Sequence, residues 1–209
     1  NRLFNILEMY KINKNLKFII FLLFFHCAWS SSVDSDNSTS HLKTIIFGAG
    51  CFWSVEKKFQ ETYGVVDVQS GYADGKNINP SYKEIIKREN RFNPNNYAEV
   101  VKVTYNSNKT SLENLLKTFF ELHDPTQENR QGNDIGVQYR SLILTSSDEE
   151  ISLSNEIKNK YQNLLTKAGF GLIKTDIKNF TNFYLAENYH QDYLKKNPNG
   201  YCPDYSTGV

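Results

Sequence analysis

The stretch that decides the fold of this chain is GAGCFWSVE, residues 48–56, in which a cysteine follows Gly-Ala-Gly and precedes two large aromatic residues. It overlaps KTIIFGAG, residues 43–50, an apolar run closed by glycines that is typical of a buried strand. Apolar side chains then recur at helical spacing, at Phe52, Val55 and Phe59. The pattern predicts that Cys51 lies where a strand ends and a helix begins.

That position favours reactivity of the Cys51 thiol. The preceding glycines let the backbone turn tightly and leave its N–H groups exposed. The partial positive charge of a helix N-terminus favours a thiolate over a thiol. Phe52 and Trp53 would add an apolar wall that suits a methyl or thioether group. The alternative is that Cys51 is a small, buried and inert residue and that Trp53 belongs to the core.

Length and composition narrow the function classes. With 209 residues, the chain is long enough for one domain with its own core. A formal net charge of +1 gives no electrostatic case for binding nucleic acid or an anionic membrane. Three cysteines, Cys27, Cys51 and Cys202, are too few and too scattered for a zinc site or a disulfide scaffold. We therefore expect no metal.

Residues 1–32 read as a targeting segment. Three lysines precede FIIFLLFF, residues 18–25, and HCAWSSS follows, an order typical of a secretory signal peptide. The apolar run is shorter than the ~20 residues that span a bilayer, so we expect no stable membrane span. Met9 is the only methionine and is interpreted as the initiator, with residues 1–8 upstream of it. The alternatives are an N-terminal anchor helix and the first half of a two-part organelle signal.

A polar linker, residues 33–42, precedes the catalytic domain expected over residues 43–209. Further strands are predicted at 65–75, 98–106, 139–147 and 171–177, and helices at 79–90, 111–124, 147–169 and 186–197. Residues 125–138 are predicted to be a loop, and residues 198–209 a coil tail. The alternation indicates an α+β, two-layer sandwich with a ferredoxin-like mixed or antiparallel sheet core and a long coil C-terminal tail.

Five motifs together resemble one family. They are GAGCFWSVE, SGYADG with NPSY, YAEVVKVTYN, FFELHDPTQENRQGNDIGVQYRS and FYLAENYHQDYLKKNPNGYC, in this order over residues 43–202. They resemble the signature segments of the type A peptide methionine sulfoxide reductases. This resemblance implies reduction of the S epimer of methionine sulfoxide, free or in proteins, as a repair of oxidative damage. It also implies no cofactor and thioredoxin as the electron donor and partner. We expect a monomer.

The resemblance also implies roles for single residues. Cys51 matches the nucleophile that attacks the sulfoxide and becomes a sulfenic acid, and Cys202 matches the thiol that resolves it into a disulfide. Glu99 matches the acid that protonates the sulfoxide oxygen. The remaining matches are Tyr82 and Tyr139, which bind that oxygen, Phe52 and Trp53, which hold the methyl group, and Asp134, a carboxylate of the substrate pocket.

Physical chemistry supports these roles, although each residue has a structural alternative. A Glu in an apolar site has a raised pKa and stays protonated near neutral pH, and phenols stabilise a developing charge. Against this, Glu99 could lie on a solvated strand face, and Tyr82 and Tyr139 could be packing residues. Asp134 could be a turn former. Tyr97 stands where many family members have His.

Two other classes of protein are open at this point. One is a secreted binding module in which Cys51 and Cys202 form a permanent structural disulfide, because extracellular cysteines usually pair. The other is a cysteine hydrolase that uses Cys51 with His190. We interpret His190 as a pocket-rim or structural residue and His123 as a brace of the loop that begins at Asp124.

Overall fold

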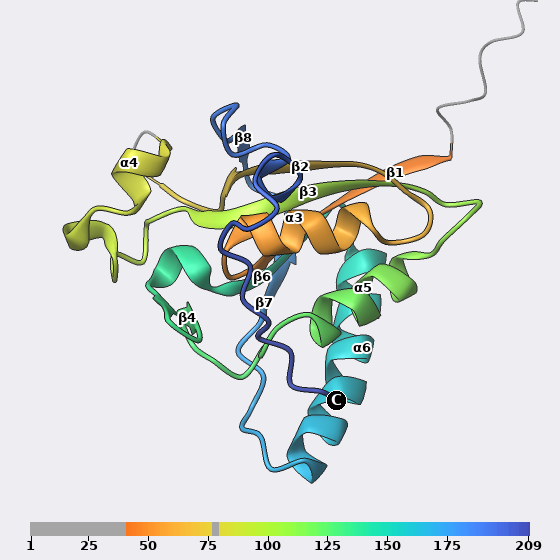
Figure 1. Ribbon diagram of the computed structural model, residues 1–209. Helices are drawn as coiled ribbons and strands as arrows, with labels where there is room; N and C mark the ends of the chain where they lie inside the picture. Colours follow the sequence, from red (N-terminus) through yellow and green to blue (C-terminus); the bar gives the residue numbers. More distant parts are fainter. Residues whose placement is uncertain (1–40, 77–79) are drawn as a thin grey trace, which may run out of the picture. The chain divides into compact units, whose positions relative to one another are not determined.

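The computed structural model describes residues 41–76 and 80–209 (Figure 1). The predicted signal peptide and nearly all of the predicted linker lie outside these residues. The described residues 41–76 and 80–209 belong to one compact unit. None of the helices in the described part of the chain has both the length and the apolar run that a bilayer crossing needs.

Strands and helices of varied length follow one another along the described residues. The strands are β1 (Leu42–Ala49), β2 (Val65–Ala73), β3 (Ala98–Asn106), β4 (Arg130–Gln131), β5 (Asp134–Ile135), β6 (Ser141–Thr145), β7 (Asp176–Asn179) and β8 (Phe183–Leu185). The α-helices are α3 (Phe52–Gln60), α4 (Tyr82–Ile85), α5 (Leu112–Glu121), α6 (Asp148–Lys167) and α7 (Tyr193–Lys196). The 3-10 turns of the described residues are η2 (Arg88–Asn90) and η3 (Val137–Tyr139), which lie in the connections.

Six strands form the main sheet in the order β7-β6-β1-β3-β2-β8, and β4 pairs with β5 apart from it. The pair β6 and β7 is parallel and the other pairs are antiparallel, so the sheet is mixed. The four inner strands lie in the spatial order β6-β1-β3-β2. Along the chain, these strands and their two larger helices come in the order β1, α3, β2, β3, α5, β6, which is the β-α-β-β-α-β connectivity. The expected α+β class with a mixed sheet is confirmed.

The helices α3, α5 and α6 share one core with the sheet face that they cover (Figure 1). Period-2 alternation places Val101 and Val103 of β3 on this face and Val100 on the other. Glu99 has the same parity as Val101, so it points under the helices. Its neighbour across the β2–β3 pair is Tyr72, which belongs to the same core.

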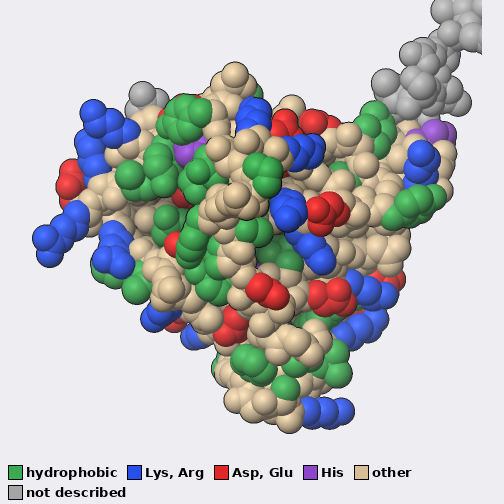
Figure 2. All heavy atoms as spheres, viewed as in Figure 1, with side chains coloured by type: hydrophobic (Ala, Val, Ile, Leu, Met, Phe, Trp, Pro, Cys, Tyr) green, Lys and Arg blue, Asp and Glu red, His purple; other side chains and the backbone are tan. Residues whose placement is uncertain are grey.

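The helix starts follow the capping residues in the sequence. Ser111 accepts a hydrogen bond from the N–H of Asn114 at the start of α5. Ser147 accepts one from the N–H of Glu150 at the start of α6, whose first turn is acidic. Figure 2 shows basic and acidic side chains interspersed over the viewed face, which agrees with the near-zero net charge.

Several segments differ from the sequence predictions. The helices expected at 79–90 and 186–197 are shorter, since the described residues there contain only the α-helices Tyr82–Ile85 and Tyr193–Lys196. The strand expected at 171–177 begins only at Asp176, because the residues before it are held on α6 instead. There the side chain of Gln162 donates to the carbonyl of Gly171 and accepts from the N–H of Ile173. The loop expected at 125–138 contains β4, β5 and η3, and the edge strand β8 was not predicted. These strands have two or three residues, too few for alternation to be read.

Phe47 of β1 provides a test of the packing. Its ring is fully buried and stacks between Phe59 and Phe119, with ring centroids 4.9 and 5.0 Å away. Replacing Phe47 with Ala should lower the free energy of unfolding by about 3–5 kcal/mol, because it leaves a cavity between β1 and the helices α3 and α5. Urea unfolding measures this. The exposed Phe92 is the matched control, and Phe92→Ala should change stability by less than about 0.5 kcal/mol. Equal effects of the two changes would contradict the assignment of the core.

Candidate active site

Cys51 is the N-cap residue of α3, directly after β1. The turn between strand and helix passes through Gly50, whose φ of +93° favours glycine. A Cβ at Gly50 would also lie 2.9 Å from the side chain of Gln131. The predicted strand-to-helix position of Cys51 is confirmed, and its side chain is buried.

The carboxyl of Glu99 lies under the start of the same helix. The N–H of Phe52 donates to Glu99 Oε2 at 3.2 Å, which joins β3 to α3. Burial raises the pKa of Glu99 to about 8, and the charge of Asp134 adds to this, although the bond from Phe52 acts in the opposite direction. Glu99 is therefore mostly protonated at neutral pH, and the alternative of a solvated strand face does not hold.

Seven of the eight predicted site residues meet in one pocket of about 80 Å³. This volume is far below the ~300–1,000 Å³ of sites that enclose drug-sized ligands, so the pocket can take only the tip of a side chain. Its walls carry a thiol, two carboxyls, three phenols and two further aromatic rings. The lining residues are Cys51, Phe52, Trp53, Tyr82, Glu99, Asp134, Tyr139 and Tyr201.

The phenols of Tyr82 and Tyr139 remain protonated. Burial, followed by the charge of Glu99, raises the pKa of Tyr82 to about 12 and also raises the pKa of Tyr139. Tyr82 is the first residue of α4, and its N–H donates to Glu187 Oε1 at 2.9 Å. Tyr139 ends the 3-10 turn η3. Both side chains can therefore donate a hydrogen bond to an acceptor in the pocket.

The predicted thiolate character of Cys51 is wrong for the resting site. Burial raises the pKa of the Cys51 thiol, and the charge of Glu99 raises it further. The backbone N–H groups of Trp53 and Ser54 lower it, as a helix N-terminus should, but they do not outweigh burial. The resting site thus holds a thiol beside a carboxyl that is mostly protonated.

Tyr201 is the pocket residue that sequence reasoning missed. Its hydroxyl contacts both oxygens of Asp134, at 3.4 and 3.3 Å, and the hydroxyl of Tyr205 at 2.7 Å. Burial raises the pKa of Asp134, and these two phenols partly offset that effect. The only signal in the sequence was that Tyr201 directly precedes Cys202.

Cys202 lies outside this pocket but shares another with Cys51. A groove of about 360 Å³ between α3 and the C-terminal tail is lined by both cysteines. Lys57 and Lys58 of α3 and Tyr205 of the tail also line it. Both thiols are free, with Cys51 buried and Cys202 exposed. Cys51 therefore lies between the acidic aromatic pocket and a groove that contains a second thiol.

Among the residues that the structure describes, the buried histidines His123 and His190 bond to groups other than the Cys51 thiol. His123 contacts the carbonyl of Phe119 at 2.7 Å and the hydroxyl of Ser141 at 2.8 Å, and burial lowers its pKa to about 4. His190 accepts a hydrogen bond from the indole of Trp53. In the described part of the chain, neither lines a pocket that contains Cys51, so the arrangement does not support a Cys–His hydrolase.

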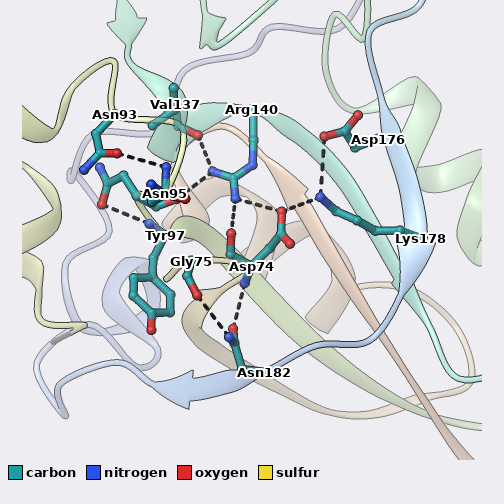
Figure 3. A network of polar contacts seen from close by, with 11 residues as sticks. Asp74, Gly75, Asn93, Asn95, Tyr97, Val137, Arg140, Asp176, Lys178 and Asn182 are labelled. Atoms are coloured by element: carbon teal, nitrogen blue, oxygen red, sulfur yellow. Dashed lines mark hydrogen bonds and ion pairs between the residues drawn. The ribbon is translucent and has the colours of Figure 1, made fainter. Parts of the chain in front are cut away.

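A polar network holds the strand ends around the site. The guanidinium of Arg140, next to Tyr139, donates to the carbonyls of Asn96 and Val137 at 3.2 and 2.8 Å. It also donates to the carbonyl and carboxylate of Asp74 at 2.7 and 3.0 Å. Figure 3 shows Asp74 between Arg140 and Lys178, the latter 2.7 Å from the carboxylate. One side chain thus links the segments that lead into β3, out of β2 and through η3.

Tyr97 contributes to packing beside this network. Its ring covers Gly75, where a Cβ would lie 2.3 Å from it, and meets Tyr184 edge-on at 5.6 Å. The side chain does not line the pocket of about 80 Å³. Across residues 41–76 and 80–209, no cluster of three or more His, Cys, Asp or Glu side chains could hold a metal ion.

Comparison with known proteins gives one family. The family model for peptide methionine sulfoxide reductase matches residues 43–207. The human mitochondrial peptide methionine sulfoxide reductase is 49% identical over 164 residues, which are 78% of this chain and 68% of that protein. The structure of methionine sulfoxide reductase A of Corynebacterium diphtheriae is similar with a TM-score of 0.72 and 41% identity, covering 81% of each chain.

A further solved structure contains a partner. Mxr1 from Saccharomyces cerevisiae in complex with Trx2 is similar with a TM-score of 0.52 and 26% identity. The match covers 79% of this chain and 89% of that chain.

Arg140 provides a test of the network. Arg140→Met should lower the free energy of unfolding by about 3 kcal/mol, because it removes the donor of three backbone carbonyls and one of the two cations at the Asp74 carboxylate, which keeps Lys178. Arg88→Met is the matched control at an exposed position and should change stability by less than about 0.5 kcal/mol. Urea unfolding of both variants decides the point. An Arg140 variant as stable as the control would mean that the network does not hold the site.

Proposed function

The chain belongs to the peptide methionine sulfoxide reductase family and is an oxidoreductase that reduces methionine sulfoxide, and we propose that it acts on the S epimer through the thiol of Cys51. The observation that carries the residue assignment is the place of Cys51 between two pockets. One pocket offers a protonated carboxyl and phenols, and the other offers a second thiol. A thiol that must first accept oxygen and then be reduced needs access to both.

The small pocket fits the head group of methionine sulfoxide. A methylsulfinyl group has a small apolar methyl and a strongly accepting oxygen. We assign the methyl to the rings of Phe52 and Trp53 and the oxygen to the donors Tyr82, Tyr139 and Glu99. The third phenol of the pocket, Tyr201, is bound to Asp134 and Tyr205 instead. Asp134 lies at the side of the tail, where it can accept a hydrogen bond from a substrate backbone N–H.

The chemical step then balances within the pocket. Glu99 protonates the sulfoxide oxygen, which makes the sulfur electrophilic, and the sulfur of Cys51 attacks it. The attack forms a transient S–S bond between Cys51 and the substrate. This bond and the S–O bond of the substrate then break as the oxygen and its proton are transferred to the sulfur of Cys51, which becomes a sulfenic acid. The proton that the thiol loses restores the Glu99 carboxyl. Methionine leaves with its sulfur reduced by two electrons, and Cys51 is oxidised by the same two.

Resolution uses the other pocket. The thiol of Cys202 attacks the sulfenic sulfur of Cys51, a disulfide forms, and water leaves. A dithiol then reduces this disulfide by exchange. Thioredoxin is the proposed donor, since the similar Mxr1 has been solved in complex with Trx2. No further cofactor enters the proposal, and we propose that the enzyme is a monomer.

A structural-disulfide module is a weaker interpretation of the same cysteines. Cys202 lies in an exposed tail with coil on both sides, and the core packs without a bond from Cys51 to it. A structural bond would be expected to join elements that the core alone does not hold. The arrangement therefore favours a disulfide that forms and opens during turnover.

The cellular compartment that we propose depends on where a thioredoxin system can reduce the enzyme. Relatives from human, rat, cattle and mouse are mitochondrial by name. Thioredoxin systems work in reducing compartments, whereas secreted cysteines usually stay oxidised. We therefore favour delivery to an organelle through a two-part signal over secretion, with residues 1–32 as the targeting segment. The secretory signal peptide stays a prediction from the sequence.

Single-turnover chemistry tests the proposal directly. In a Cys27→Ser background, the pre-reduced chain should convert one equivalent of a dabsyl-labelled methionine S-sulfoxide and lose two thiols. The R epimer should remain unreacted. Cys51→Ser should abolish product, whereas Cys202→Ser should give one product per enzyme and a trapped sulfenic acid. Product from the Cys51 variant, or sustained thioredoxin-driven turnover by the Cys202 variant, would refute the thiol assignment.

The pH dependence tests the role of Glu99. The acid must be protonated to act and its pKa is about 8 in the folded chain, so the single-turnover rate should be high below that pH and fall as pH rises through it. Glu99→Gln should slow the step by about 10²-fold, because the amide keeps the contact with Phe52 but carries no acidic proton. It should also remove the decrease of the rate at high pH, which is the alkaline limb of the pH–rate profile. Glu56 is the control, since it is equally buried but lies outside the pocket. Glu56→Gln should leave the limb in place, and a limb that survives in Glu99→Gln would assign the acid elsewhere.

A further inference from the structure

We propose that His190 is a positioning residue of this active site: its Nδ1 holds the indole of Trp53 and thereby sets the wall of the pocket that takes the substrate methyl. The proposal rests on the proposed function, since it assumes that the wall formed by Trp53 contacts the substrate. It assigns a task to a buried imidazole that the chemical steps do not use.

Two contacts define the place of the indole. Trp53 Nε1–H donates to His190 Nδ1 at 3.1 Å. The indole also stacks on the ring of Tyr193, with centroids 3.8 Å apart and an interplanar angle of 13°. Stacking alone restrains the tilt of the ring but allows it to slide in its own plane. The directional hydrogen bond removes that freedom, because N–H···N geometry weakens steeply away from linearity.

The hydrogen bond selects one tautomer of His190. Because Nδ1 accepts from Trp53, it carries no proton, and the neutral ring must carry its proton on Nε2. That nitrogen is buried without a hydrogen-bond partner in the described structure and lies 3.9 Å from Glu187 Oε2. Burial lowers the pKa of His190, which favours the neutral ring that can accept. A doubly protonated His190 ring would place its Nδ1–H against the Nε1–H of Trp53, and the hydrogen bond between the two residues would be lost.

Glu187 favours the same tautomer. Burial alone would raise the pKa of Glu187, but the hydroxyl of Tyr72, at 2.6 Å, and the N–H of Tyr82, at 2.9 Å, lower it overall. An ionised carboxylate beside Nε2 attracts the N–H dipole and so places the proton on the far side of the ring from Trp53. The carboxylate of Glu187 also accepts the hydrogen bond from the backbone N–H of Tyr82. Glu187 therefore lies next to two residues that hold the pocket wall, Tyr82 and His190.

His190 acts through Trp53 and does not meet the substrate itself. The imidazole is 1% exposed and lies among aromatic rings, with centroids 4.9 Å from Phe52, 4.6 Å from Tyr82 and 4.3 Å from Tyr189. It does not line the small pocket. Removing its acceptor would leave a partly buried indole N–H unpaired, and the ring would turn to find water. The pocket would then lose its fit to the methyl group, which affects substrate binding more than the chemical step.

Two variants separate the hydrogen bond from simple packing, one that keeps an acceptor in a smaller side chain and one that keeps the volume without an acceptor. His190→Asn keeps an acceptor where Nδ1 lies, whereas His190→Leu has a similar volume and no acceptor. Both are made in the full chain carrying Trp29→Phe, so that Trp53 is the only tryptophan. The measurements are the emission spectrum of Trp53 and the separate KM and kcat for methionine S-sulfoxide with thioredoxin as reductant.

The expected pattern is asymmetric. His190→Leu should shift the Trp53 emission and raise KM about tenfold, as the loss of one hydrogen bond implies, with kcat changed by less than about threefold. His190→Asn should stay close to the unsubstituted chain in both readouts. His123→Asn, at the other buried histidine, should lower stability but leave the emission and KM unchanged. Identical behaviour of the Leu and Asn variants would overturn the proposal.

A measurement without any change at His190 guards against loss of folding. In the full chain labelled with ¹⁵N-tryptophan, the Nε1–H resonance of Trp53 should lie downfield and exchange slowly with solvent. A random-coil position with fast exchange would overturn the proposal as well. Failure of the proposed function is distinguishable, because the unsubstituted chain would then reduce no methionine sulfoxide while the emission and NMR results still report on Trp53.

Discussion

The hydrogen bond from the N–H of Phe52 to the carboxyl of Glu99 is the contact on which the site depends. It joins the first residue of α3 to a residue of β3 that is far away in the sequence. It fixes the helix start, and with it the thiol of Cys51, above the sheet. It also gives a hydrogen-bond partner to one oxygen of the Glu99 carboxyl, which is buried away from solvent.

This placement makes Cys51 and Glu99 electrostatically dependent on each other. The charge of Glu99 raises the pKa of the Cys51 thiol, so the two groups resist being ionised together. When the acid gives its proton to a substrate oxygen, the thiol proton is the nearest one that can replace it. The same burial that makes a resting thiolate unfavourable therefore keeps both protons available until a suitable acceptor enters.

The sequence allowed most of this arrangement to be predicted, and the failures have a common cause. Alternation along β3 gave Glu99 the parity of the buried Val101, so its side of the sheet could be inferred. The helix-terminus effect on Cys51 is local and has the predicted direction, but the opposing burial is set by elements distant in sequence. Tyr201 and the edge strand β8 were missed for the same reason, since their partners Asp134 and β2 are also distant in the sequence.

The protonation of the pocket suits the substrate that it is proposed to take. Near neutral pH, Cys51, Glu99, Tyr82 and Tyr139 carry their protons for most of the time, so these four side chains give the pocket strong donors without adding charge. A sulfoxide is neutral and accepts strongly, so it gains hydrogen bonds there without the desolvation cost of an ion. A carboxylate of similar size would lose its hydration on entry, and a thioether would leave the donors unpaired. The product methionine is such a thioether, so reduction itself weakens binding and favours release.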